Sequence, residues 1–485
     1  MKTKNLSPQA AVAELIKQYD AATTALHAAL ERYFTDKIVP TAAERQAFCY
    51  PELRVTYDRV ELQPRISRAY AKFQHPGVYS TTITQPEFFR DYLEEQLGYL
   101  VRDYGATVEV LPSTQEIPYP YVLQSGDDLG AGGVSAAELA LHFPIPELSL
   151  VGDEIADGHF EFQTGPHHPL ALFDAVRVDY SLKRLQHYSG TRFDKFQPWI
   201  LLTNYHRYVD QFQSWAIAQL KADGPYDALH IPGGGVVTRG MSDAEAQEVL
   251  DASPWHKFQM PAYHLSRSDG AGGITLANIG VGPSNAKNLT DHLAVLRPNC
   301  WLMIGHCGGL RLSQRIGDYV LAHAYLRQDH ILDRLVPPEI PIPALAEVQV
   351  AMQQAAAQVT GEKGEALKAR LRTGTVMTHD DRNWELRWTL ERKRINLSRA
   401  IAIDMESGTL AAQGYRFRVP YGTLLCVSDK PLHGEIKLPG AANAFYDRAV
   451  GEHLMIGLAA LENLRTTKSS LHSRKLRSFD EPPFR

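Results

Sequence analysis

Cysteine, long apolar runs and excess charge are all scarce in this sequence. Its 485 residues include four cysteines, Cys49, Cys300, Cys307 and Cys426, and none forms a C-x-x-C pair. Structural zinc sites normally use such pairs, so we expect free thiols, a reducing compartment and no structural metal. No apolar run is long enough to cross a membrane, and the polar start MKTKNLSPQAAVAELIKQYD lacks the apolar core of a signal peptide. These absences predict a cytoplasmic protein.

The balance of charge argues against two classes of partner. The formal net charge is −5 and the pI is near 6.4, with 44% hydrophobic and 22% charged residues. A protein that coats nucleic acid or a membrane surface normally carries a basic excess, so we expect neither partner. The composition is that of a soluble globular protein. Because 485 residues exceed the size of one hydrophobic core, we expect two domains.

The first part of the chain is predicted to form an α+β domain, which we place at residues 1–185. Ser7 and Pro8 suit the start of a helix over residues 7–34. Alternating segments at 53–62 and 77–84 predict strands. Thr84 and Glu87 resemble a capping box that opens a helix ending near residue 104, and a strand follows near 107–111. The stretch 112–190 is rich in proline and glycine and predicts a crossing between domains, with a helix near 178–187.

The pattern changes at Trp199 to apolar strands that alternate with helices. Alternation of this kind predicts an α/β domain, at residues 186–485, with a parallel or mixed β-sheet flanked by helices. The predicted strands are 199–203, 227–231, 262–266, 274–280, 300–305, 319–326, 374–378, 400–405 and 421–428. The clearest predicted helices are 208–220, 283–296 and 407–413. No repeat of fixed period is visible.

Two of these strands end on carboxylates. The run IAIDM leads into Glu406, and YGTLLCVS leads into Asp429. Chemistry in α/β sheets gathers at the carboxyl ends of strands, so the two acids can face one substrate. A carboxylate can hold sugar hydroxyls, and a carboxyl of raised pKa can protonate a leaving group. The pair predicts cleavage of a glycosidic bond.

Glycine-rich segments follow two other strands. Gly280 and Gly282 precede a helix, where backbone N–H groups can receive a polar oxygen, although a plain tight turn is an equal alternative. Gly308 and Gly309 predict a turn that lets the backbone approach a ligand. Arg311, just after them, could hold a phosphate or form a surface ion pair.

Taken in order, the segments NIGVGPSNA, IGHCGGL, GDYVLAHAY, IDMES and VSDKP resemble the strand-end motifs of the nucleoside phosphorylase/nucleosidase superfamily. The whole chain, including the ending HSRKLRSFDEPPFR, is similar to the bacterial AMP nucleosidases. This resemblance implies a phosphorylase-like mixed sheet, with AMP as the small-molecule substrate. It also implies hydrolysis of AMP to adenine and ribose 5-phosphate in purine salvage and adenylate-level regulation, with no cofactor for the chemistry.

By the same resemblance, Asp429 is the general acid that protonates N7 of the adenine. Met405 packs on the ribose and Glu406 accepts its 2′- and 3′-hydroxyls, while the Gly280/Gly282 and Gly308/Gly309 segments line the side from which water attacks. Adenine leaves more readily as a neutral base than as an anion, so the pKa of Asp429 has to be raised. Glu406 should instead stay ionised.

The resemblance leaves other roles open. The candidates for the 5′-phosphate are Arg207, Arg311 and Lys430, although an isolated arginine such as Arg207 is more often a solvated residue. Trp384 could stack on adenine, against the alternative of ordinary core packing. The water-activating glutamate of related nucleosidases has no counterpart after the first strand, so Asn204 or Glu406 would orient the water.

The resemblance further implies allosteric activation by MgATP, inhibition by phosphate and a homohexamer. The catalytic fold works alone in relatives, so the N-terminal domain should be regulatory. Arg65, Arg68 and Lys72 could form an anion site there or simply a solvated basic face. Two rival functions remain: a phosphorylase that uses inorganic phosphate, and a nucleotide sensor that binds without cleaving. A dehydrogenase is disfavoured because no acidic ribose-binding residue follows IGVGP.

Overall fold

The computed structural model of the protein describes residues 5–58, 69, 71, 73, 75–123, 134–152, 168–435 and 441–467, with backbone only at 441–448. These residues divide into two compact units between Lys183 and Arg184. The division lies within helix α6 (Ala175–Ser189), close to the boundary expected after residue 185. No helix in the described part of the chain is long and apolar enough to cross a membrane.

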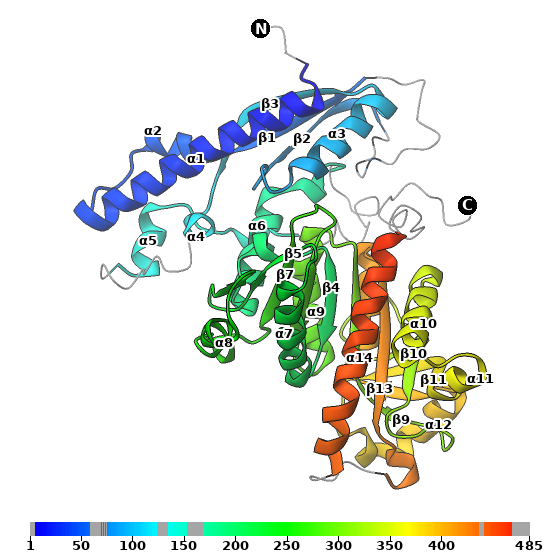
Figure 1. The fold of residues 1–485 in the computed structure, drawn as a ribbon. Helices are drawn as coiled ribbons and strands as arrows, with labels where there is room; N and C mark the ends of the chain where they lie inside the picture. Colours follow the sequence, from blue (N-terminus) through cyan, green and yellow to red (C-terminus); the bar gives the residue numbers. More distant parts are fainter. Residues whose placement is uncertain are drawn as a thin grey trace. The chain divides into compact units, whose positions relative to one another are not determined.

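Unit 1 has the α+β architecture expected from the sequence (Figure 1). Helix α1 (Pro8–Asp36) begins where predicted, because the Ser7 side chain accepts a hydrogen bond from the N–H of Ala10. It packs on helix α3 (Arg90–Tyr104) and on an antiparallel sheet of order β2–β1–β3. The strands are β1 (Cys49–Tyr57), β2 (Gly77–Thr82) and β3 (Thr107–Glu116), and the short helices are α2 (Ala42–Arg45), α4 (Tyr119–Val122) and α5 (Ala136–His142).

The predicted capping box at Thr84 is wrong. Helix α3 begins three residues after Glu87, at Arg90, and its N-cap Phe89 makes no side-chain cap. The Thr84 hydroxyl instead donates to the buried carboxylate of Asp179, with 2.7 Å between Oγ1 and Oδ1. A buried carboxylate without donors is far costlier than an exposed helix end, so the long-range bond prevails.

Unit 2 is built on one mixed sheet of order β12–β11–β10–β13–β9–β4–β8–β7–β5–β6. Its strands are β4 (Trp199–Thr203), β5 (Tyr226–His230), β6 (Val236–Thr238), β7 (Ala262–Arg267), β8 (Ile274–Asn278), β9 (Cys300–Gly309), β10 (Tyr319–Gln328), β11 (Leu371–His379), β12 (Ala402–Asp404) and β13 (Tyr421–Asp429). Each predicted strand is present, and the short β6 is an addition that the sequence did not predict. The α/β fold class is therefore confirmed.

One end of this sheet closes on itself. Strand β12 pairs with β11 on one side and with β9 on the other, so that β9, β13, β10, β11 and β12 form a ring. The closing contact pairs Ala402 with Gly309 and Ile403 with Gly308. The ring brings the ends of β12 and β13 to the same strand, β9.

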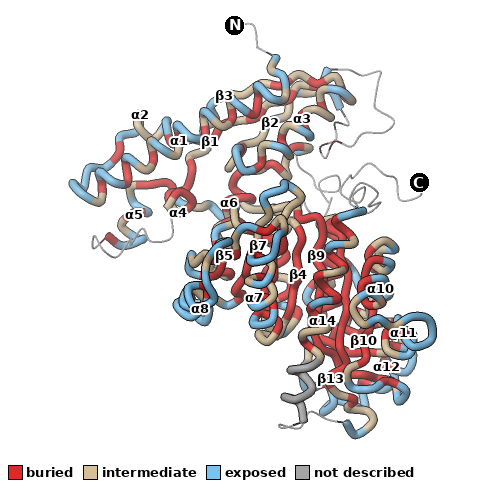
Figure 2. The backbone as a smooth tube through the Cα atoms, in the orientation of Figure 1, coloured by how far each residue is buried: buried red, intermediate tan, exposed pale blue. Residues whose placement is uncertain are grey.

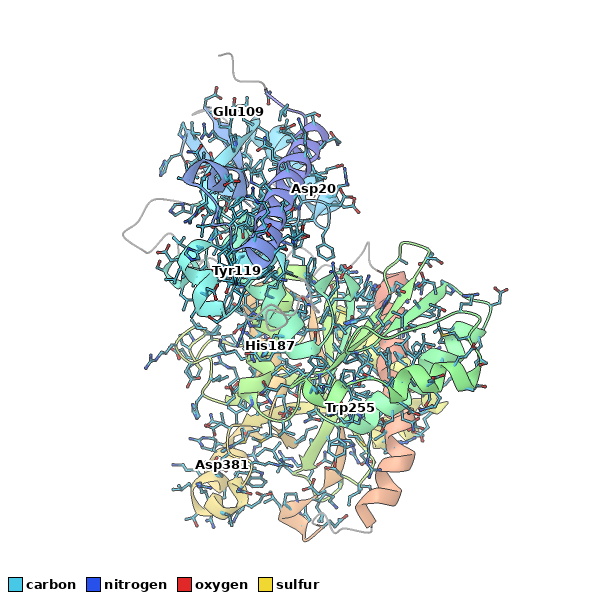
Figure 3. All side chains as sticks on the ribbon, turned by 90° about the vertical axis from the view of Figure 1, so that its left-hand side faces the viewer. Asp20, Glu109, Tyr119, His187, Trp255 and Asp381 are labelled. Carbon is cyan, nitrogen blue, oxygen red and sulfur yellow. The ribbon has the colours of Figure 1, made fainter. Side chains whose placement is uncertain are left out.

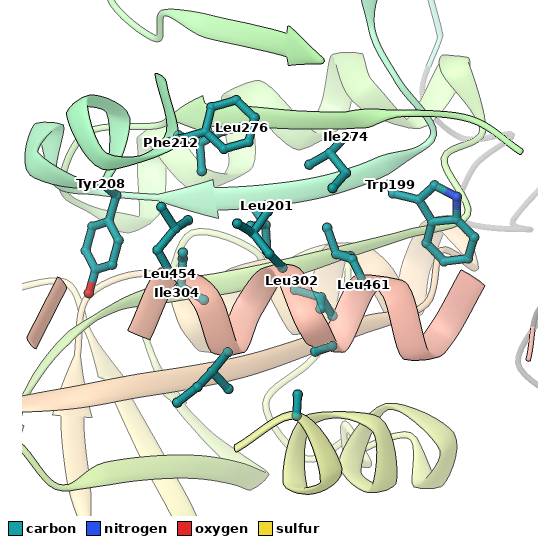
Figure 4. Packing of buried hydrophobic residues seen from close by; sticks show 14 of the residues in the cluster. Trp199, Leu201, Tyr208, Phe212, Ile274, Leu276, Leu302, Ile304, Leu454 and Leu461 are labelled. Atoms are coloured by element: carbon teal, nitrogen blue, oxygen red, sulfur yellow. The ribbon is translucent and has the colours of Figure 1, made fainter. Parts of the chain in front are cut away.

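Helices cover both faces of the sheet. They are α7 (His206–Lys221), α8 (Asp243–Asp251), α9 (Pro283–Leu293), α10 (Ala346–Thr360), α11 (Gly364–Arg370), α12 (Trp388–Ser398), α13 (Ser407–Phe417) and α14 (Ala441–Thr466). The strands between them are buried along most of their length (Figure 2). In β4, Trp199 and Leu201 pack with α7 and α14 on one face (Figure 4), while Ile200 and Leu202 pack with α9 and α13 on the other. Burial on both faces explains the uninterrupted apolar run WILLT.

Candidate active site

Glu406 lies at the centre of the candidate site. It follows β12 and is the N-cap residue of α13, and its side chain is fully buried. Its Oε2 accepts a hydrogen bond from Asn204 Nδ2 at 2.8 Å, and its Oε1 accepts one from the backbone N–H of Gly282 at 2.6 Å. Asn204 follows β4 and Gly282 follows β8. Three strand ends therefore meet at one carboxylate, as strands of a sheet bring distant residues to one edge.

The glycines before α9 give the backbone the shape that this contact needs. Gly280 has φ of 68° and Gly282 has φ of 112°, both in the region that favours glycine. The N–H of Gly280 donates to Asn278 Oδ1 at 3.1 Å, which closes the turn, and the N–H of Gly282 is directed to Glu406. The segment is thus both a tight turn and a donor of a backbone hydrogen bond to the site.

The protonation of Glu406 differs from the expectation. Burial raises the pKa of Glu406, and the neighbouring charge of Asp404 raises it further, while the bonds from Gly282 and Asn204 lower it. The surroundings of Glu406 therefore oppose the ionised form that the sequence analysis expects, and its carboxyl gains affinity for a proton. The motif did place it at the strand end, but the motif could not show that its surroundings exclude water so fully.

Asp429 is the last residue of β13 and lies opposite Gly308 of β9. Its side chain is half-buried, and the Ser428 hydroxyl lies 2.7 Å from its Oδ1. The same hydroxyl lies 3.3 Å from the carbonyl oxygen of Cys307. The carboxyl is therefore held at the end of β13. Strand β13 pairs with β9, and β9 also pairs with β12, the strand that leads into Glu406.

The predicted turn at Gly308 and Gly309 is wrong, because both residues belong to strand β9. A Cβ atom on Gly308 would lie 3.1 Å from Ile403 Cγ2, and one on Gly309 would lie 2.9 Å from Val427 Cγ1. A side chain would not fit at either position, because β12 and β13 pack against β9 from both sides. The two glycines therefore allow the strands of the ring to pack closely.

The predicted cations differ in their surroundings. Arg311 is half-buried just after β9, where its backbone N–H donates to Gln314 Oε1 at 2.9 Å. Among the described residues, no carboxylate pairs with its guanidinium, so the surface ion pair considered for it is not found there. Arg207 is half-buried in the first turn of α7. Lys430 is buried and pairs with Glu435, so its charge is already balanced.

Comparison with known proteins places the chain in a family. Residues 10–167 match the family described as bacterial AMP nucleoside phosphorylase N-terminus, and residues 236–462 match the phosphorylase superfamily. The AMP nucleosidases of Escherichia coli strain K12 and of E. coli O157:H7 are each 56% identical over all of this chain and 99% of their own length. The chain belongs to the AMP nucleosidase family.

Two solved structures with lower identity are similar to part of this family member. The AMP nucleosidase from Bacteroides thetaiotaomicron is 27% identical, with a TM-score of 0.43, and the match covers 59% of this chain and 97% of that one. Purine nucleoside phosphorylase from Toxoplasma gondii is 16% identical, with a TM-score of 0.42, and covers 58% of this chain and 97% of its own.

Trp384 and Met405 are the remaining residues that the sequence analysis assigned to the site of this AMP nucleosidase family member. Trp384 is almost fully buried in a small cluster with Leu310, Met377 and Ile403, among others. Its surroundings match the core-packing alternative, so we do not assign it to the base. Met405 is half-buried between Asp404 and Glu406.

The sequence analysis did not identify the polar residues next to the segment that carries Glu406, which are Asp404, Thr378 and Ser407. The sequence analysis treats Asp404 only as a strand residue, although it is a second acid beside Glu406 in IDMES, and this was the available signal. Within the described residues, no three His, Cys, Asp or Glu side chains are grouped closely enough to hold a metal ion.

Proposed function

We propose that this chain hydrolyses the N-glycosidic bond of AMP to give adenine and ribose 5-phosphate, in the service of purine salvage and adenylate-level regulation. The observation that carries the proposal is the 56% identity, over the whole chain, to proteins named AMP nucleosidase. The convergence of three strand ends on Glu406, with Asp429 at the end of a strand of the same ring, supports it.

Asp429 acts as the general acid in this proposal. Cleavage of the C1′–N9 bond builds positive charge on the sugar and negative charge on the base. A proton passed from Asp429 to N7 lets adenine leave as a neutral molecule. The Ser428 hydroxyl, 2.7 Å from Asp429 Oδ1, holds the carboxyl in a fixed orientation for that transfer.

Glu406 holds the 2′- and 3′-hydroxyls of the ribose, and Met405 packs on the sugar. Glu406 does this in its carboxylate form, which burial disfavours in the free protein and which positive charge developing on the sugar favours. The carboxylate would then stabilise the transition state more than the ground state, which is what accelerates a reaction.

Asn204 orients the attacking water. Its amide N–H donates to Glu406, which leaves Oδ1 as an acceptor, and this buried oxygen has no hydrogen-bond donor among the described residues. It can therefore accept a hydrogen bond from water whose oxygen attacks C1′. Gly280 and Gly282 line this side of the site, and we propose the same position for Gly308 and Gly309 along β9.

The 5′-phosphate is bound by Arg311, with Arg207 as a second candidate. Arginine suits this task because its planar group matches phosphate geometry. The absence of a carboxylate partner for Arg311 in the described part of the chain supports its assignment. Lys430 is the weakest candidate, because Glu435 already pairs with it.

Regulation and assembly follow from the family resemblance. We propose MgATP as an allosteric activator, phosphate as an inhibitor, no cofactor for the chemistry, and a homohexamer. Unit 1 has its own core and is the proposed effector domain. The residues considered for an anion site there, Arg65, Arg68 and Lys72, lie outside the described residues. The four cysteines are free, which fits the proposed cytoplasmic location.

Adenine release from AMP in phosphate-free buffer tests the proposal. The wild type should release adenine and ribose 5-phosphate, MgATP should accelerate the release, and Asp429→Asn should lose at least about a hundredfold in kcat. Asp223→Asn, an exposed aspartate in the same unit, is the matched control and should behave as the wild type. Adenine that appears only after phosphate is added would identify a phosphorylase, and AMP binding without turnover would identify a sensor.

A further inference from the structure

The start of helix α13 is capped in an unusual way. Its N-cap residue is Glu406, whose carboxylate is turned to Asn204 and Gly282 and makes no cap. The N–H groups of Glu406 and Ser407 instead donate to Asp404 Oδ2, at 3.3 Å and 2.8 Å. A helix start normally takes its acceptor from its own N-cap side chain. Here the acceptor is Asp404 of the preceding strand, so the carboxylate of the N-cap residue Glu406 remains available to the active site.

Thr378 of β11 extends this arrangement. It lies beside Asp404 in the parallel β11–β12 pair, and both side chains are buried. The Thr378 hydroxyl donates to Asp404 Oδ1 at 2.7 Å and accepts the N–H of Gly408 at 2.6 Å. The fit is close, because a Cβ atom on Gly408 would lie 3.0 Å from Thr378 Oγ1. Asp404 and Thr378 thus bind three successive N–H groups of the segment that carries Glu406.

The choice of an acid at position 404 calls for a reason beyond capping. A serine or asparagine could accept these N–H groups without bringing a second buried charge two residues from Glu406. The other groups that act on Glu406 among the described residues are uncharged: the side-chain amide of Asn204 and the backbone groups of Gly282 and Met405. Asp404 is the nearest ionisable group to Glu406; burial raises the pKa of Asp404 as well, and in its charged form Asp404 disfavours the carboxylate form of Glu406.

We propose that Asp404 and Thr378 are positioning residues of the reaction: together they fix the backbone of Glu406, and the charge of Asp404 determines when Glu406 becomes a carboxylate. The proposal rests on the proposed function, since it takes Glu406 as the group that holds the ribose. Neither residue touches AMP in this scheme. Each acts through Glu406.

The test is the pH profile of kcat/KM for AMP in wild-type protein and Asp404→Asn. Activity should rise with pH as Glu406 ionises. Removal of the neighbouring charge should move the midpoint of that rise to lower pH by about one unit or more, because a like charge nearby opposes ionisation. A residue that only supports the fold would lower the profile at every pH and leave its midpoint in place.

Substitutions at Thr378 separate the hydrogen bonds from the charge. Thr378→Val removes the hydroxyl that links Asp404 to Gly408 and should lower kcat/KM about tenfold. Thr378→Ser keeps that hydroxyl and should restore most of the activity. Thr373→Val, at an exposed position of the same strand, is the matched control and should leave kcat/KM unchanged.

The outcomes distinguish this inference from the proposed function. If Glu406→Gln has no effect on AMP cleavage, the proposed role of Glu406 fails. If Glu406→Gln abolishes cleavage but Asp404→Asn leaves the midpoint unmoved, the present inference alone is overturned. Should Asp404→Asn fail to fold, as judged by tryptophan fluorescence, the comparison of Thr378→Val with Thr378→Ser decides, and equal activity of those two variants would refute the positioning role.

Discussion

The buried carboxyl of Asp179 should make the stability of unit 1 fall as pH rises. It lies in α6, where Tyr50 OH donates to its Oδ2 at 2.5 Å and Thr84 donates to its Oδ1. Burial raises the pKa of Asp179 from 3.8 to about 7. The folded chain then holds a proton that the unfolded chain has lost, so the stability is full below about pH 4 and declines until about pH 7. A shift of this size corresponds to about 4 kcal/mol.

Asp179→Asn should remove most of this decline, because the amide carries no proton to lose. The assay is urea unfolding at pH values between 4 and 8, with the burial of the tyrosines of unit 1 followed by second-derivative absorbance. All six tryptophans lie after residue 198, so tryptophan fluorescence reports unit 2 separately in the same sample. The variant should become more stable than the wild type above pH 7, by up to about 4 kcal/mol.

A matched control and one confounding group complete the design. Asp20→Asn changes an exposed aspartate of α1, labelled in Figure 3, and should keep the wild-type slope. Burial also raises the pKa of Asp174, so a smaller decline should persist in every variant. Equal slopes in wild type and Asp179→Asn would refute the argument that burial of this carboxyl controls the pH dependence.

The buried His453 of unit 2 should contribute to the pH dependence in the opposite sense. Burial lowers the pKa of His453 to about 3, so its stabilising contribution is present above about pH 6.5 and is lost as pH falls toward 3. The urea midpoint of the wild type relative to His453→Gln, read by tryptophan fluorescence, should therefore drop between pH 7 and pH 5, and a rise would contradict this. Gly282→Ala should cost more than about 1 kcal/mol, because φ is 112°, and should also raise KM for AMP by disturbing the N–H that binds Glu406. Gly280→Ala carries similar backbone strain, so equal losses of activity in the two variants would argue against a specific role for the Gly282 N–H. Arg311→Gln should raise KM for AMP about tenfold or more and leave the cleavage of adenosine unchanged, and an equal loss on both substrates would rule out a phosphate contact.

The strands of unit 2 could be predicted because they are buried on both faces. A strand such as β4, with Trp199 and Leu201 on one side and Ile200 and Leu202 on the other, appears in the sequence as a continuous apolar run. Helix α14 was not predicted, because apolar residues such as Leu454, Leu458 and Leu461 surround alanines and glycines with little amphipathic contrast. The capping box at Thr84 failed because a local motif carries no information on a carboxylate 95 residues away.

The residues of the candidate site could be proposed from the sequence, but the hydrogen bonds between them could not. Strand ends point to Glu406, Asp429, Asn204 and Gly282 because the chemistry of α/β sheets gathers there. The bond between Asn204 and Glu406 joins residues 202 positions apart, and it exists because the strands reach the same edge. The raised pKa of Glu406 depends on how completely the fold excludes water, which no spacing of residues in a sequence expresses.

The ring of β9, β13, β10, β11 and β12 has a consequence for how activity appears during refolding. Its closing pair joins Ala402 to Gly309 and Ile403 to Gly308 and is the smallest pairing in the ring. Such a short pairing contributes little stability by itself, so it should form only after the longer pairings of the ring have positioned β12 and β9. The segment that carries Glu406 begins immediately after this pairing. A refolding chain should therefore bury most of its tryptophans before it recovers AMP cleavage, and a chain with an open ring would be compact but would not cleave AMP.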